Sequence, residues 1–244
     1  MVIIIMKFHI EKTSICLSLV FFVFLTTYAV LNSHELGILN LKLGSFVFGQ
    51  SQNLSLSTII NDGSPYYGNL SAPLVVVDFS DFQCHLCKRY VDNTEPQINS
   101  TYIQKGKVVY VFKHLPNRGI ESKPISLAAQ CINDQGKFWD FHKLLYEKQG
   151  PIDSGWANSD NIKKFVSQLN GINTDEFNSC FKDKKYDSFI DNDIALANSL
   201  GFHATPSFLI MNSEGSIIKK IEGPKPFPIF SSVIETLEKD MANN

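Results

Sequence analysis

The chain has 244 residues, of which 44% are hydrophobic, and its formal net charge is −2. This length is enough to bury one substantial core, in one or two domains. The nearly balanced charge gives no reason to expect nucleic acid as a partner, because such proteins usually carry a basic excess.

The N-terminal part of the chain is predicted to have three segments. Residues 1–12 form a basic cytoplasmic flank, residues 13–31 are uncharged and strongly apolar, and residues 32–57 form a polar tether. An uncharged apolar segment is typical of a membrane-spanning anchor or of a secretory signal, and a buried core helix is a third interpretation. The weak cleavage site at residues 27–29 leaves anchor and cleaved signal open.

Both membrane interpretations place the rest of the chain outside the cytoplasmic membrane, where paired cysteines are expected to be oxidised. Cys16 lies inside the apolar segment and is interpreted as a small hydrophobic residue. The remaining four cysteines, Cys84, Cys87, Cys131 and Cys180, form an even set.

After the tether, the chain predicts two buried strands joined by a helix. Residues 58–60 read as a short strand before a turn, residues 74–79 and 107–114 as buried strands, and residues 84–103 as a helix that Pro96 kinks. A strand, a helical crossover and a second strand imply a parallel pair and an α/β domain.

The following stretch is predicted to be helical until near the C-terminus. The helical pieces are residues 124–133, 137–148, 160–170, 175–182 and 187–200. Ser159 and Thr174 are the expected N-caps of two of these pieces. The chain then predicts a hairpin of residues 207–211 and 217–222 and a last helix at residues 230–241. Residues 58–244 therefore read as an α/β domain with a helical insertion at about 118–200.

The most informative motif is Cys84-His85-Leu86-Cys87, which follows the first buried strand. Two thiols three positions apart on a helix share one face, so they can close a small disulfide ring and reopen it. If Cys84 begins the helix, its sulfur faces unpaired N–H groups and the positive end of the helix dipole, which favour the thiolate. The pair is therefore a candidate site for thiol–disulfide exchange.

Two further features converge on this pair. Asp78 lies in an otherwise apolar strand, six residues before Cys84, where we expect it to exchange a proton with the buried sulfur of Cys87. Thr205-Pro206 directly precedes a predicted strand. A cis peptide there would turn the Thr205 backbone toward the cysteines, although most X–Pro bonds are trans.

Residues 77–87, VDFSDFQCHLC, resemble the active-site segment of thioredoxin-fold proteins and, more narrowly, that of the DsbA-like disulfide oxidoreductases. Three other stretches support the resemblance, GNLSAP at 68–73, QGKFW at 135–139 and LGFHATPSF at 200–208. The resemblance spans about residues 60–241. It implies an α/β thioredoxin fold with a helical insertion, preceded by the membrane-spanning or signal helix.

The resemblance also implies an activity and a set of roles. Cys84 would be the exposed nucleophile, Cys87 the resolving thiol, Pro206 the cis-proline that faces them, with Thr205 beside it, and Asp78 the buried acid. The protein would then be an extracytoplasmic oxidase that needs no cofactor, acts on reduced or unfolded exported proteins and is re-oxidised by a membrane partner. Reductase and isomerase activities use the same cysteines and stay open as alternatives.

The dipeptide between the cysteines departs from the family pattern. Many DsbA-like proteins have Pro-His and thioredoxins have Gly-Pro at the positions that His85 and Leu86 occupy here. This dipeptide tunes the stability of the thiolate and hence the redox potential. We expect His85 to present positive charge near Cys84.

The other two exported cysteines, Cys131 and Cys180, lie on separate predicted helices of the insertion. Their placement, which related sequences share, suggests one structural disulfide. Two buried free thiols, or a second redox pair that passes electrons to the first, are the alternatives.

Three rival functions use the same motif. A Cys-x-x-Cys pair can be half of a zinc site, but no second closely spaced pair of ligands accompanies it, so no metal is assigned. A copper carrier would use the two thiols with His203 as a distal ligand. A catalytically idle binding domain would leave the cysteine pair above Asp78 unexplained.

Overall fold

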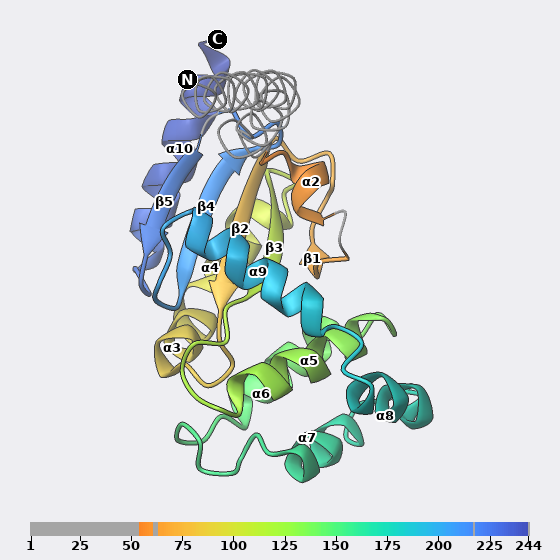
Figure 1. Ribbon diagram of the computed structural model, residues 1–244. Helices are drawn as coiled ribbons and strands as arrows, with labels where there is room; N and C mark the ends of the chain where they lie inside the picture. The colour runs from red at the N-terminus through yellow and green to blue at the C-terminus, as the bar shows by residue number, and fades with distance from the viewer. Residues whose placement is uncertain (1–53, 61–62, 217, 244) are drawn as a thin grey trace, which may run out of the picture. The chain divides into compact units, whose positions relative to one another are not determined.

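The computed structural model describes residues 54–60, 63–216 and 218–243 (Figure 1). The predicted basic flank, the apolar segment and the tether up to residue 53 lie outside the described residues. In the described part of the chain, no helix combines the length and the apolar character that crossing a membrane requires.

Five strands form one sheet in the order β1-β3-β2-β4-β5. They are β1 (Tyr66–Tyr67), β2 (Leu74–Ser80), β3 (Val108–His114), β4 (Ser207–Asn212) and β5 (Ile218–Glu222). β2 and β3 are parallel, as the strand–helix–strand pattern predicted, and the other neighbours are antiparallel. In this register Asp78 lies between Phe112 of β3 and Phe208 of β4.

The three central strands are buried on both faces, which explains their nearly continuous apolar sequences. One face packs against α3 (His85–Asn93), α4 (Glu95–Ile98) and α10 (Phe227–Ala242), and the other against α2 (Leu56–Ile60) and α9 (Asp187–Ser199). Side chains alternate between the two faces of a strand. Asp78 therefore shares the α3 face with Leu74 and Val76.

The helix predicted at residues 84–103 is not continuous. α3 ends at Asn93, Thr94 separates it from α4, and residues Asn99–Ile103 form a π-helical turn. Pro96 has no N–H and its ring crowds the preceding turn, so the break falls just before it.

The insertion between β3 and β4 consists of five helices, of which α9 returns to cover the sheet (Figure 1). The other four are α5 (Ser122–Asn133), α6 (Phe138–Glu147), α7 (Ser159–Val166) and α8 (Thr174–Lys182). The N-caps of α7 and α8 are Asn158 and Asn173, one residue before the predicted Ser159 and Thr174. Asparagine is among the best N-caps, and both side chains accept hydrogen bonds from amides of the first turn.

A buried ion pair fixes α9 on the sheet. Lys113 Nζ of β3 lies 2.9 Å from Asp193 Oδ1, and both side chains are buried. The other oxygen of Asp193 accepts a hydrogen bond of 2.8 Å from the backbone N–H of His114. The insertion is thereby attached to the strand that also leads into it.

The predicted strand at residues 58–60 is wrong, because residues 56–60 form the helix α2. Leu56 and Ile59, three positions apart, both face the core, which is helical spacing. The Ser55 hydroxyl accepts a hydrogen bond from the N–H of Thr58 in the first turn. The last helix, α10, begins at Phe227, before the predicted residue 230, with Pro228 in its first turn.

Candidate functional site

The candidate site forms where the end of β2 meets the start of β4. These strands are antiparallel neighbours, and Phe79 pairs with Ser207, so the residues before β4 lie beside those after β2. A turn around Asp81, whose carbonyl accepts the N–H of Cys84 at 3.0 Å, leads from β2 to the N-cap of α3. That N-cap is Cys84, and the Thr205-Pro206 peptide opposite it is cis.

Cys84 and Cys87 are both reduced in this structure. The Sγ of Cys84 lies 3.3 Å from the carbonyl oxygen of Thr205, to which Cys84 donates only when its thiol is protonated. The expectation that Cys84 is exposed is wrong, because its side chain is 0% exposed. Thr205 is itself buried and packs against the Cys84 sulfur. The sequence did not predict how closely these two residues approach.

The surroundings of Cys84 favour its thiolate. The Cys87 thiol, which donates a hydrogen bond to the Cys84 sulfur, is the largest cause that lowers the pKa of Cys84 to about 4. Burial opposes this shift, whereas Thr205, the Cys87 amide in the first helical turn and Arg118 reinforce it. A thiol with this pKa is ionised at neutral pH.

The pKa of Cys87 is shifted in the opposite direction. Its side chain is fully buried, and burial raises its pKa, as does the neighbouring negative charge of Cys84. The pair therefore carries one proton at neutral pH, on Cys87. This division of roles between two adjacent thiols suits a nucleophile or leaving group at Cys84 and a protonated partner behind it.

Asp78 lies within electrostatic range of both thiols and has no exposure to solvent. Burial raises its pKa to about 7, and hydrogen bonds from Ser80 Oγ at 2.6 Å and Tyr110 Oη at 2.9 Å partly offset the shift. A carboxyl group with this pKa both gives and accepts protons near neutrality.

The cation that favours the Cys84 thiolate is Arg118, which sequence reasoning missed. Its backbone N–H donates to Asp81 Oδ2 at 2.9 Å, and its Nη2 lies 3.5 Å from the Thr205 carbonyl oxygen. Parallel neighbours end at the same edge of a sheet, so a residue shortly after β3 lies near residues that follow β2. That rule is the signal that could have identified it. The expected cation, His85, is exposed.

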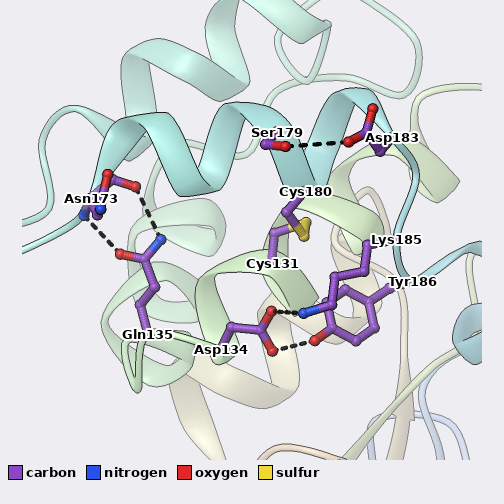
Figure 2. The surroundings of a disulfide bond; sticks show 9 residues. All are labelled: Cys131, Asp134, Gln135, Asn173, Ser179, Cys180, Asp183, Lys185 and Tyr186. Atoms are coloured by element: carbon purple, nitrogen blue, oxygen red, sulfur yellow. Dashed lines mark hydrogen bonds and ion pairs between the residues drawn. A yellow bond between two sulfur atoms is a disulfide. The ribbon is translucent and has the colours of Figure 1, made fainter.

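Cys131 and Cys180 form a disulfide between α5 and α8, with an S–S distance of 2.05 Å (Figure 2). The two residues are separated by 49 positions in the sequence. The structure therefore contradicts the alternative of two free thiols. The bond lies in the insertion and not among the residues around Cys84.

Polar contacts surround this disulfide. Asp134 Oδ2 lies 2.7 Å from Lys185 Nζ, and its other oxygen accepts a hydrogen bond from the Tyr186 hydroxyl (Figure 2). The Gln135 side chain bonds both backbone groups of Asn173, at 2.7 and 3.1 Å. These contacts stabilise the same junction that the disulfide closes.

The described residues contain no group of three or more His, Cys, Asp or Glu side chains that could hold a metal ion. His203, the distal ligand that a copper carrier would use, is exposed, and its carbonyl accepts a hydrogen bond of 3.1 Å from Asn117.

Known proteins resemble this chain over most of its length. The family described as thioredoxin matches residues 60–235. The chain is 26% identical over 181 residues to disulfide bond formation protein D of Bacillus subtilis, covering 73% of this chain and 78% of that protein. Crystal structures of oxidised BdbD from Bacillus subtilis and of alpha-DsbA1 from Wolbachia pipientis resemble it with TM-scores of 0.64 and 0.62. Their identities are 26% and 30%, with coverage of 72% and 73% of this chain and 94% and 92% of theirs.

Proposed function

The chain belongs to the thioredoxin family and, within it, to the DsbA-like thiol–disulfide oxidoreductases, and we propose that it forms disulfide bonds in exported proteins. The observation that carries this proposal is the placement of Cys84 at the N-terminus of α3, opposite the cis Thr205-Pro206 peptide, where its surroundings lower its pKa to about 4. A stabilised thiolate favours the reduced form of the enzyme, so the Cys84–Cys87 disulfide is readily reduced and acts as an oxidant.

The proposed reaction begins with the oxidised enzyme. A substrate thiolate attacks the Sγ of Cys84, the Cys84–Cys87 bond breaks, and Cys87 leaves as a thiolate that takes up a proton. A second substrate thiolate then attacks the substrate sulfur of this mixed disulfide and releases Cys84 as a thiolate. The substrate dithiol loses two electrons and the enzyme disulfide gains them.

We assign the proton transfer to Asp78. Because burial keeps both Asp78 and Cys87 away from water, a proton for the departing Cys87 thiolate must come from a neighbouring group. The pKa of Asp78, raised to about 7, suits that exchange.

The other residues of the site are assigned to substrate binding and to the charge on Cys84. Thr205 and Pro206 border the sulfur and would lie beside the bound substrate chain. The Arg118 side chain, which touches the same Thr205 carbonyl, would keep a positive charge beside Cys84. His85, exposed in the first turn of α3, would contact the substrate rather than the sulfur.

We place the enzyme outside the cytoplasmic membrane. A disulfide such as Cys131–Cys180 persists in oxidising compartments. Residues 13–31 would export the domain and either anchor it or be removed. Reduced or unfolded exported proteins would be the substrates, and a membrane partner would accept the electrons.

The test is the equilibrium of the Cys84–Cys87 pair with glutathione, together with the oxidation of a reduced protein. We expect a potential well above that of thioredoxin, about −270 mV, and stoichiometric oxidation of substrate by the oxidised enzyme. Cys84→Ser should abolish both, whereas the matched double variant Cys131→Ser/Cys180→Ser should retain them. A potential near that of thioredoxin would instead indicate a reductase.

A further inference from the structure

A second carboxyl group, that of the half-buried Glu95, lies on the same face of the sheet as Asp78 and has one buried oxygen. Glu95, the first residue of α4, accepts a hydrogen bond of 3.3 Å from the Tyr67 hydroxyl at Oε1. Its other oxygen, Oε2, is buried and has no hydrogen-bond partner among the described residues. A buried polar atom of this kind requires an explanation, and the exchange reaction proposed above gives Glu95 no task.

Three tyrosines occupy the space between the two carboxyl groups. The Tyr110 hydroxyl donates to Asp78 Oδ2 at 2.9 Å, and its ring lies 5.1 Å from the ring of Tyr67. The Tyr90 hydroxyl is buried without a partner among the described residues. Burial, followed by the charges of Asp78 and Glu95, raises the pKa of Tyr90. The hydroxyl groups of these three tyrosines therefore lie near one another between Asp78 and Glu95.

Glu95 also reaches a cavity of about 570 Å³ that α3, α4 and α6 line. The rim of the cavity carries exposed Asp92, Lys143 and Glu147, so the cavity is continuous with the surface. The buried Nε2 of His142, also without a partner among the described residues, belongs to the same lining. The outer end of the polar set thus meets solvent at a place separate from Cys84.

The exchange reaction requires a path by which protons from solvent reach Asp78. When Cys87 leaves and takes a proton from Asp78, Asp78 must recover a proton from solvent. A substrate joined to Cys84 covers that side, and Asp78 itself has no exposure. The proton therefore has to arrive from the opposite side, where the tyrosines and Glu95 lie.

We propose that Glu95 exchanges protons between Asp78 and solvent in the cavity, through the hydroxyls of Tyr110, Tyr90 and Tyr67. This inference rests on the proposed oxidoreductase function and assigns the route of its proton. For each disulfide that the enzyme gives up, one proton moves from solvent through Glu95 to Asp78 and on to the Cys87 sulfur. Re-oxidation of the enzyme sends it back along the same route. Glu95 acts through Asp78 and never touches the sulfur.

The groups that face Glu95 come from five elements besides its own. On the buried side they are Tyr67 of β1, Asp78 of β2, Tyr90 of α3 and Tyr110 of β3. On the cavity side they are Asp92 of α3 and His142, Lys143, Tyr146 and Glu147 of α6. Burial and the charge of Asp78 raise the pKa of Glu95 to about 8, so the group carries a proton at neutral pH. Glu95→Gln therefore replaces a neutral group by a neutral group of the same shape.

The test compares Glu95→Gln with Glu147→Gln, an exposed acid on the rim of the same cavity. The oxidised full-length protein is mixed with excess dithiothreitol, and reduction of Cys84–Cys87 is followed by stopped flow from pH 5 to pH 9. General acid–base contributions are typically 100-fold or more, and because Asp78 remains in place we expect a drop of about 10-fold for Glu95→Gln. Glu147→Gln should match the unsubstituted protein.

Three further readouts separate a proton route from a structural role. The equilibrium potential and the alkylation rate of Cys84 should not change in Glu95→Gln, because the end states are the same. Acetate, which fits the cavity and carries a proton, should restore the rate of Glu95→Gln more than that of the unsubstituted protein. Tyr110→Phe, which keeps the ring and removes the hydroxyl, should slow the same step, and it serves as a second test if Glu95→Gln does not fold.

An unchanged rate in Glu95→Gln, or a rate that falls together with the potential, would overturn the inference. In either case the unsubstituted protein would still oxidise dithiothreitol, and the proposed function would stand. Failure of the unsubstituted protein to oxidise dithiols would overturn the proposed function and this inference with it.

Discussion

The lowered pKa of Cys84 makes the stability of the reduced protein depend on pH in a calculable way. In the folded protein this pKa is about 4, whereas an ordinary cysteine thiol has a pKa of about 9. Between these two pH values the unfolded chain binds one proton more than the folded protein, so folding stability rises with pH. This contribution is complete above the unfolded pKa and is lost as the pH falls through 4.

The size of this contribution to folding stability follows from the difference between the pH of the measurement and the pKa of Cys84 in the folded protein. At pH 7 the thiol is protonated in the unfolded chain. In the folded protein it is ionised, because pH 7 lies about three units above its folded pKa. At about 1.4 kcal/mol per unit, the thiolate contributes about 4 kcal/mol to the free energy of unfolding. The site lies near the surface, where solvent screens the charge, so about 4 kcal/mol is an upper limit.

The assay is urea denaturation of the reduced protein and of reduced Cys84→Ala at several pH values between 4 and 7. The two proteins are compared by the difference in their free energies of unfolding. The contacts that Cys84→Ala loses add an amount to this difference that does not depend on pH. The raised pKa of Asp78 acts in the opposite direction with pH, but it is present in both proteins and largely cancels. We expect the difference in the free energy of unfolding to shrink by up to about 4 kcal/mol from pH 7 to pH 4. A difference in the free energy of unfolding that does not vary with pH would refute the lowered pKa of Cys84.

Three further outcomes are expected. Arg118→Gln removes the positive charge beside Cys84 and should raise the pKa of that thiol, measured as slower alkylation at pH 5. Cys180→Ser opens the disulfide loop of the insertion and should cost about 4 kcal/mol in urea denaturation of the otherwise oxidised protein. Asp193→Ala removes the carboxylate that lies 2.9 Å from the buried Lys113 ammonium and should lower the free energy of unfolding by about 3–5 kcal/mol.

Each outcome has a matched control. Arg118→Lys keeps a positive charge and should alkylate faster than Arg118→Gln, and equal rates would contradict the role of charge. Disulfide removal should leave the potential of the Cys84–Cys87 pair unchanged, and a shifted potential would make that bond part of the redox site. Asp191 pairs with Lys123 at 2.7 Å on the surface. Its replacement by alanine should lower the free energy of unfolding by less than about 1 kcal/mol.

The parts of the fold that depend on local pattern were predictable from sequence. β2 and β3 are apolar because both faces are covered, and a strand followed by Cys-x-x-Cys and a helix places Cys84 at an N-terminus. The position of Pro206 before β4 was also visible in the sequence. These features need only near neighbours along the chain.

The features that the sequence did not predict depend on which segments meet in space. Arg118 joins the site only because β3 lies beside β2, and the cover over Cys84 depends on the approach of Thr205. Glu95 lines a cavity only because α6 supplies other parts of the lining. A five-residue helix such as α2 is too short for its periodicity to be distinguished from a strand.

The proposed oxidase activity depends most directly on the ionisation of the Cys84 sulfur. In the reduced protein, the alkylation rate of Cys84 can be measured with iodoacetamide as a function of pH and checked by thiolate absorbance. We expect a single titration with a midpoint near pH 4. A midpoint at the ordinary thiol value of about 9 would contradict the proposed role of Cys84.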